Sequence, residues 1–180
     1  KKDFPFFTRN PGISYMDTGA TAIKPSAVLL AMQEYYETYG VNIHRGIYDL
    51  SGRATQEYEA ARGKVANFIN ADTSETIFTS GTTHGLNFLA RSLCKSLKHG
   101  DNIVLTRLEH HANLIPWQEM KKLYGFDIRF IELHPAGHPE AYTLDMESAK
   151  NVIDTNTKIV SVTLMSNVLG TIIPAKTLVG

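Results

Sequence analysis

The stretch RLEHHANLIPW, residues 107–117, places one carboxylate beside two adjacent imidazoles and ends at the only tryptophan of the chain. Three interpretations are open: Glu109, His110 and His111 bind a metal ion, they simply open a helix, or one imidazole forms a flat wall against an aromatic ligand. Adjacent side chains point to opposite faces of a strand and diverge by about 100° on a helix. A shared metal ion is therefore the weakest interpretation, and we predict no metal site in the chain.

A second stretch whose residues could bind a ligand is SGTTHG, residues 80–85. Thr82 and Thr83 stand where an expected strand ends and an expected helix begins, so free backbone N–H groups, the helix dipole and two hydroxyls converge on one point. That combination suits a phosphate group, although Thr is equally common as a plain helix cap. The stretch matches neither the P-loop nor the G-x-G-x-x-G pattern. Any bound phosphate therefore belongs to a small ligand, and an imidazole wall nearby would explain both stretches at once.

Two further stretches carry polar groups that suit a small ligand. Asn167 in SNVLG follows an apolar run, and its amide can hydrogen-bond a ligand oxygen, but Asn is also common in turns. In NIHRG, His44 and Arg45 stand beside a glycine, and a planar guanidinium suits a carboxylate. A surface arginine is more often only solvated.

The sequence predicts no catalytic or binding role for one cysteine and two further histidines. Cys94 lies among leucines in an expected helix, so it is predicted to be a core cysteine rather than a nucleophile. The irregular segment HPAGHPEAYT, residues 134–143, is predicted to be a surface excursion in which His134 and His138 are solvated.

From Thr76 onward, short β-rich runs alternate with helical patterns. This alternation predicts an α/β fold with a mainly parallel sheet covered by helices on both faces. Ligands of such sheets bind at the carboxyl ends of the strands, where SGTTHG, RLEHHAN and MSNVLG lie. The expected strands are 76–79, 102–106, 127–133 and 158–164, and the expected helices run to about residue 97, over 113–124 and from about 145.

The preceding part of the chain is predicted to be a short strand followed by two helices. The strand is ISYMD, residues 13–17, and one helix runs from Pro25 to Gly40. The other helix runs over about 51–69, where apolar residues recur at steps of three and four.

The composition is that of an ordinary globular protein. Of the 180 residues, 43% are hydrophobic and 20% charged, and 18 basic residues balance 18 acidic ones. No global field therefore recruits nucleic acid or an anionic membrane, which favours a small-molecule enzyme or a protein-binding module. One cysteine cannot form an intrachain disulfide, and no apolar run has the length of a bilayer span. These features predict a cytoplasmic protein.

Taken in order, YMDTGATAIKP, NIHRG, SGTTHGLN, EHHANLIPW and SNVLGT resemble the cysteine desulfurases of the SufS type, within the class V aminotransferase group. The resemblance covers about Ile13 to Pro174. It implies the aspartate-aminotransferase-like fold of enzymes that use pyridoxal 5'-phosphate (PLP), with residues 1–70 leading into the large domain and 71–180 forming its first half. It also implies a homodimer that releases sulfur from L-cysteine as an enzyme-bound persulfide, leaves L-alanine, and passes the sulfur to an acceptor protein for iron–sulfur clusters.

The resemblance assigns a role to each matching position. Thr82 and Thr83 hold the cofactor phosphate, His110 stacks on the cofactor ring, and Asn167 bonds the phenolic oxygen close to the substrate, so that His110 and Asn167 form the catalytic set. His111 receives no role, and His84 stands where relatives usually carry Glu. The residues expected around the substrate are Ala20, His44, Arg45 and Asn167.

The same resemblance implies that several essential residues lie beyond Gly180: the Schiff-base lysine, the aspartate facing the pyridine nitrogen, the substrate-carboxylate arginine and the persulfide cysteine. We therefore expect the chain to be the N-terminal half of such an enzyme, inactive by itself. Two alternatives remain open. One is another class V enzyme such as selenocysteine lyase, and the other is a non-catalytic remnant or dimerisation module.

Overall fold

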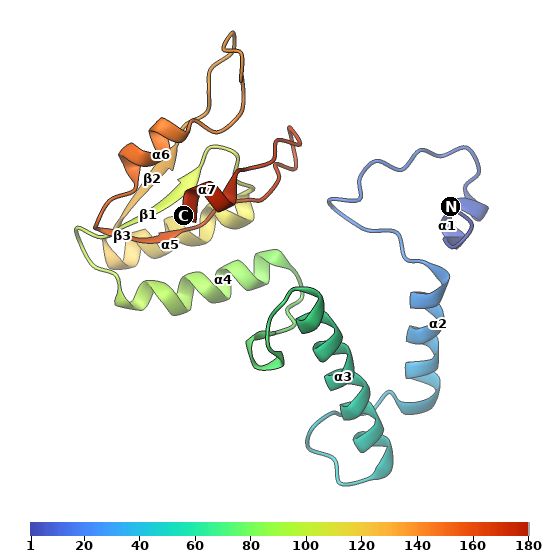
Figure 1. Ribbon diagram of the computed structural model, residues 1–180. Helices are drawn as coiled ribbons and strands as arrows, with labels where there is room; N and C mark the ends of the chain where they lie inside the picture. The colour runs from blue at the N-terminus through green and yellow to red at the C-terminus, as the bar shows by residue number, and fades with distance from the viewer. Residues whose placement is uncertain (180) are drawn as a thin grey trace. The chain divides into compact units, whose positions relative to one another are not determined.

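The structure, a computed structural model, describes residues 1–179 (Figure 1). The chain divides into two units, Lys1–Phe78 and Thr79–Gly180. Within the part of the chain that the structure describes, no helix has both the length and the apolar character needed to cross a bilayer.

A parallel three-stranded sheet organises the second unit. β1 (Asn102–Thr106) lies in the centre, with β2 (Asp127–Ile131) on one side and β3 (Thr157–Val160) on the other. Both pairings are parallel, as the alternation of strands and helices predicts. All five residues of β1 are buried, because a central strand has neighbours along both edges and helices over both faces.

Helices cover both faces of this sheet, and this prediction is also confirmed. α4 (Thr82–Leu93) and α5 (Ile115–Tyr124) supply residues to the core on one face, and α6 (Met146–Val152) does so on the other (Figure 1). Alternation along β1 sends Ile103 and Leu105 to the first face and Val104 to the second. The first core contains Ala90, Cys94, Leu97, Ile103, Leu105, Trp117, Met120 and Phe126. The second contains Val104, Leu108, Ile131, Leu144, Ala149 and Ile173.

The helix ends follow from local sequence. Asp145 caps α6, since its carboxylate accepts the N–H groups of Glu147 and Ser148 at 2.9 and 3.2 Å. α5 ends at Gly125, whose φ of 74° lies in the left-handed region that favours glycine. The remaining elements of this unit are the short 3-10 turns η3 (Cys94–Ser96) and η4 (His111–Asn113), and α7 (Ala175–Val179).

Asp154 ties all three strands together at their amino ends. Its carboxylate accepts from Asn102 of β1 at 3.0 Å and from Arg129 of β2 at 2.7 Å, and its N–H donates to Thr157 Oγ1 of β3 at 3.0 Å. The hydrogen bond from Arg129, with smaller contributions from Asn102 and Asn156, lowers the pKa of Asp154 to about 2. The carboxylate therefore stays ionised at neutral pH and satisfies the amide of Asn102, which is fully buried.

The first unit is helical. α3 (Asp49–Phe68) confirms the helix expected over about 51–69. The helix expected from Pro25 to Gly40 also forms, but it changes character: α2 (Ser26–Glu34) continues as the π-helical turn η1 (Tyr35–Tyr39). The remaining elements are α1 (Pro5–Arg9) and the 3-10 turn η2 (Thr73–Glu75).

Two predicted strands are wrong. ISYMD, residues 13–17, and TIFT, residues 76–79, have the composition of strands, but neither forms a strand. A strand is stabilised by ladder hydrogen bonds to a neighbour, and the three described strands pair only among themselves. β2 and β3 are also shorter than predicted, since they end at Ile131 and Val160.

Candidate functional site

The N-terminus of α4 is open to an anion. Its N-cap is Gly81, at φ 151°, and no side chain caps the helix. Thr82 and Thr83 therefore begin the helix itself, so the interpretation of these hydroxyls as plain caps is wrong. The first intrahelical bond runs from Gly85 N–H to the Gly81 carbonyl at 3.1 Å. The amides ahead of Gly85 in the first turn have no intrahelical acceptor, and the dipole of the helix favours negative charge there.

His84 contacts Ser80, the residue just before the N-cap of α4. Its Nδ1 accepts the Ser80 N–H at 3.3 Å and lies 3.1 Å from Ser80 Oγ. A ring nitrogen that accepts an N–H carries no proton, so this contact assigns the proton of the neutral ring to Nε2. Ser80, Thr83 and His84 line a pocket of about 580 Å³ together with Asn87, Phe88 and Arg91.

His110 follows β1 and caps the turn η4. Its Nδ1 accepts the Ala112 N–H at 3.0 Å, which fixes the ring orientation and assigns the proton of the neutral ring to Nε2. His110 therefore does begin a helical turn, and only its Nδ1 is used in capping it. The other edge of the ring takes no part in the cap, so the helix-opening and ligand-wall interpretations are compatible. His110 is exposed, as a residue that meets a ligand must be.

Asn167 lies at the tip of a tight turn after the last strand. Ser166 is buried, and its Oγ accepts the N–H groups of Val168 and Leu169 at 3.3 and 3.2 Å. The Ser166 N–H in turn donates to the Thr171 carbonyl at 2.9 Å. These bonds hold the turn, and Asn167 is left exposed.

His110 and Asn167 meet in one pocket of about 500 Å³, although 56 residues of chain separate them. The strand ends bring them together, as expected for a parallel sheet. The wall of the pocket includes Arg107, whose guanidinium is paired with Glu132 at 2.8 Å. The other residues lining it are Leu108, Glu109, His111, Leu133, Ser166, Val168 and Leu169.

The predicted phosphate site belongs to a different pocket from His110 and Asn167. Thr83 lines the pocket beside α4, whereas Thr82 lines none of the pockets described. α4 nevertheless packs against η4, the turn that His110 caps, and against α5. The predicted phosphate site on α4 and the predicted ring site at η4 therefore belong to elements that contact each other within the second unit.

Glu109 has a structural role that the sequence did not reveal. Its Oε1 accepts from Thr106 Oγ1 at 2.6 Å and from Thr163 N–H at 2.9 Å. Its Oε2 accepts from Asn113 Nδ2 at 2.7 Å. Both carboxylate oxygens are therefore engaged in hydrogen bonds within the fold.

Asn113 extends this network into the core. Its Oδ1 accepts from Ser161 Oγ at 2.6 Å and from Trp117 Nε1 at 3.0 Å. Glu109, Asn113 and Trp117 recur at steps of four, the helical spacing that could have suggested mutual contacts. The network links the end of β1 to the chain just past β3. Its members Glu109 and Asn113 flank His110 in the sequence.

His44 and Arg45 belong to the first unit, in a loop attached to α3. The His44 N–H donates to Thr55 Oγ1 at 2.9 Å, and Nε2 of His44 lies 3.7 Å from Glu59. A Cβ at Gly46 would overlap the Ser51 side chain, so glycine is required there. Ala20 lies in a turn in which its N–H donates to the Asp17 carbonyl.

Cys94 lies in the first core and is fully buried. Burial raises the pKa of its thiol to about 11, because an apolar environment disfavours the thiolate. The cysteine is therefore a packing residue, as the surrounding leucines predict.

The aminotransferase class-V family matches residues 14–180, and the chain belongs to this family. A cysteine desulfurase of Serratia proteamaculans is 41% identical over 98% of the chain, and a probable cysteine desulfurase of Halalkalibacterium halodurans is 42% identical over the same share. The solved structure of a cysteine desulfurase from Thermococcus onnurineus superposes with a TM-score of 0.88 at 40% identity over 98% of the chain. The chain spans 43% of the length of those two curated relatives and 42% of the Thermococcus structure.

Proposed function

We propose that the chain provides the phosphate and ring contacts of a PLP-dependent cysteine desulfurase of the SufS type. The observation that carries this proposal is the convergence of His110 and Asn167 on one pocket, next to the turn η4 that packs against the uncapped helix α4. The similarity to cysteine desulfurases supports the choice of reaction. L-cysteine as substrate, a homodimer and a sulfur-acceptor protein are parts of the same proposal.

The donors of this unit fit a phosphorylated pyridine. The amides and hydroxyls of Thr82 and Thr83 would bind the phosphate, for which the uncapped α4 is suited. His110 would lie against the ring, and the Asn167 amide would donate to the phenolic oxygen. Bound PLP supplies an electron-withdrawing ring that stabilises negative charge at the amino-acid carbon.

The protein's own part is binding, orientation and proton placement. Because the Ala112 N–H fixes His110 Nδ1, the imidazole presents an Nε2 that holds a proton and can exchange it with a neighbouring group. The turn held by Ser166 places the backbone of Asn167 at the wall of the pocket, where its amide can reach a ligand. Both residues are exposed in the pocket and are therefore accessible to a ligand.

Binding of pyridoxine 5'-phosphate, measured by equilibrium dialysis, tests the site directly. This analogue has no aldehyde, so it cannot react with surface lysines. We expect Thr83→Ala to weaken binding about tenfold, because a hydrogen bond to a charged phosphate is worth about 1.5–3 kcal/mol. Thr83→Ser keeps the hydroxyl and should bind like the unaltered chain.

The same assay tests the contact between His110 and the cofactor ring by comparing two substitutions. We expect His110→Ala to weaken binding about fivefold through loss of stacking, worth about 0.5–1.5 kcal/mol. His111→Ala removes the adjacent exposed imidazole and should change little. Equal losses of affinity in His110→Ala and His111→Ala would place the ligand elsewhere. So would an affinity that neither Thr83→Ala nor His110→Ala changes.

We further propose that these 180 residues do not desulfurate cysteine by themselves. The resemblance matches none of their lysines to the residue that binds PLP covalently, and Cys94 is too buried to accept sulfur. Incubation with PLP and L-cysteine should yield no more alanine and sulfide than free PLP does. Turnover above that background, abolished by substituting one lysine of the chain, would contradict this proposal.

A further inference from the structure

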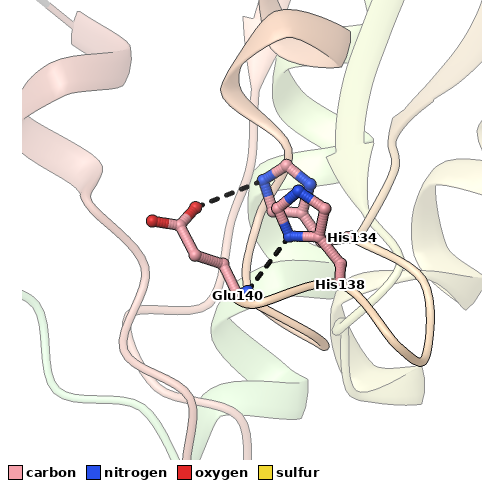
Figure 2. A group of neighbouring side chains, drawn as sticks. All are labelled: His134, His138 and Glu140. Atoms are coloured by element: carbon pink, nitrogen blue, oxygen red, sulfur yellow. Dashed lines mark hydrogen bonds and ion pairs between the residues drawn. The ribbon is translucent and has the colours of Figure 1, made fainter.

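The loop between β2 and α6 gathers three potential metal ligands, none of which lines a pocket described above. One ligand atom each from His134, His138 and Glu140 lies within 4.8 Å of the other two, and no other group of three such residues occurs among the described residues 1–179. Figure 2 shows the two rings overlapping, with the Glu140 side chain reaching back to His134. The sequence predicts these histidines to be merely solvated.

The backbone of this loop is fixed by hydrogen bonds. The His134 N–H donates to the Thr143 carbonyl at 3.0 Å, and the Tyr142 N–H donates to the His134 carbonyl at 2.9 Å. The Glu140 carbonyl accepts from both the N–H and the Oγ1 of Thr143, at 3.1 and 2.7 Å. An ion would therefore meet a loop that is already folded, and only side chains would have to move.

The side chains lie close to the separation that an ion requires. Zinc binds imidazole nitrogen and carboxylate oxygen at about 2.0–2.2 Å in a tetrahedron, which sets neighbouring ligand atoms about 3.4 Å apart. His134 Nε2 and Glu140 Oε2 are 3.6 Å apart. The widest separation in the group, up to 4.8 Å, must shorten by about 1.4 Å. His138 and Glu140 are exposed, so no core packing resists that movement.

We propose that His134, His138 and Glu140 form a binding site for a divalent transition-metal ion, with zinc as the reference ion. Two imidazoles and one carboxylate favour zinc, nickel or copper over magnesium or calcium, which prefer oxygen ligands. Three protein ligands leave a position for water. The site does not depend on the proposed cofactor or on its pocket.

Two features limit the affinity. The rings are stacked, with centroids 4.1 Å apart and planes 7° apart, so their nitrogens do not yet converge. The Glu140 N–H also donates to His138 Nδ1 at 3.0 Å. An ion on Nε2 would move the ring proton to Nδ1, opposite that N–H, so the His138 ring must turn out of this bond. We therefore expect a micromolar site rather than a nanomolar one.

Calorimetric titration of the purified chain with zinc chloride, in a buffer free of chelators, tests the proposal. We expect one ion per chain. His138→Ala and Glu140→Ala should each weaken binding at least tenfold, because each removes one of three ligands. His99→Ala removes another exposed histidine that is not part of the group and should leave the affinity unchanged.

Three outcomes would overturn the site. They are the absence of saturable binding below about 1 mM, an unchanged affinity in the His138→Ala, Glu140→Ala double variant, and an equal loss in His99→Ala. The double variant should still bind pyridoxine 5'-phosphate like the unaltered chain. The failure of the metal site and the failure of the proposed function are therefore separate results.

Discussion

Replacing Trp117 by alanine should lower the free energy of unfolding by about 3–5 kcal/mol. Trp117 is 1% exposed in the core that α4 and α5 form on the sheet, so alanine would leave a large cavity. Its Nε1 also donates to Asn113 Oδ1 at 3.0 Å. Urea unfolding followed by far-UV circular dichroism measures the change, since the variant has no tryptophan fluorescence.

Trp117→Phe is the matched control for this prediction. Phenylalanine fills most of the space but cannot donate to Asn113, so the loss should be about 1–2 kcal/mol. A loss below about 1 kcal/mol in Trp117→Ala would mean that the residue does not support this core.

Replacing Glu109 by alanine should cost about 2–4 kcal/mol, because it removes the acceptor of three donors at once. The Thr163 N–H and the Asn113 amide are partly or fully buried, and the Asn113 amide would keep its bond to the Ser161 carbonyl at 3.2 Å. The same variant should bind pyridoxine 5'-phosphate more weakly, since the neighbouring His110 loses the turn that positions it. Unfolding and dialysis on the same preparation measure both effects.

Glu119→Ala is the control for Glu109→Ala. Glu119 is exposed and, among residues 1–179, pairs only with Lys122 at 2.6 Å, three residues further along α5. Exposed pairs of this kind contribute about 0.5 kcal/mol or less. Similar losses in the two variants would contradict a special role for the Glu109 network.

The candidate site depends partly on local sequence and partly on tertiary contact. Thr82 and Thr83 could be placed at a helix start from the small-residue turn before them, and His110 and Asn167 at strand ends from the apolar runs that precede them. The types of these side chains are enough to indicate a small phosphorylated ligand with an aromatic ring. The sequence did not indicate that Thr83 and His110 lie in separate pockets, because pocket boundaries depend on side chains from several elements.

The sequence by itself determined the elements whose signals are local. The strand NIVLT, the long helix α3, the capping of α6 by Asp145 and the end of α5 at Gly125 each depend on residues within a few positions of one another. The parallel order of the sheet also followed, because short strands joined through helices leave few other arrangements.

Only the tertiary structure decided the features that need a partner far along the chain. TIFT has the composition of a strand, yet a strand requires a neighbour to accept its hydrogen bonds, and the three described strands pair only with one another. Glu109 became a structural acceptor because folding brought Thr163 to it, 54 residues away. A hydrogen bond depends on where both groups lie in space, and for distant residues that position is set by the packing of the whole unit.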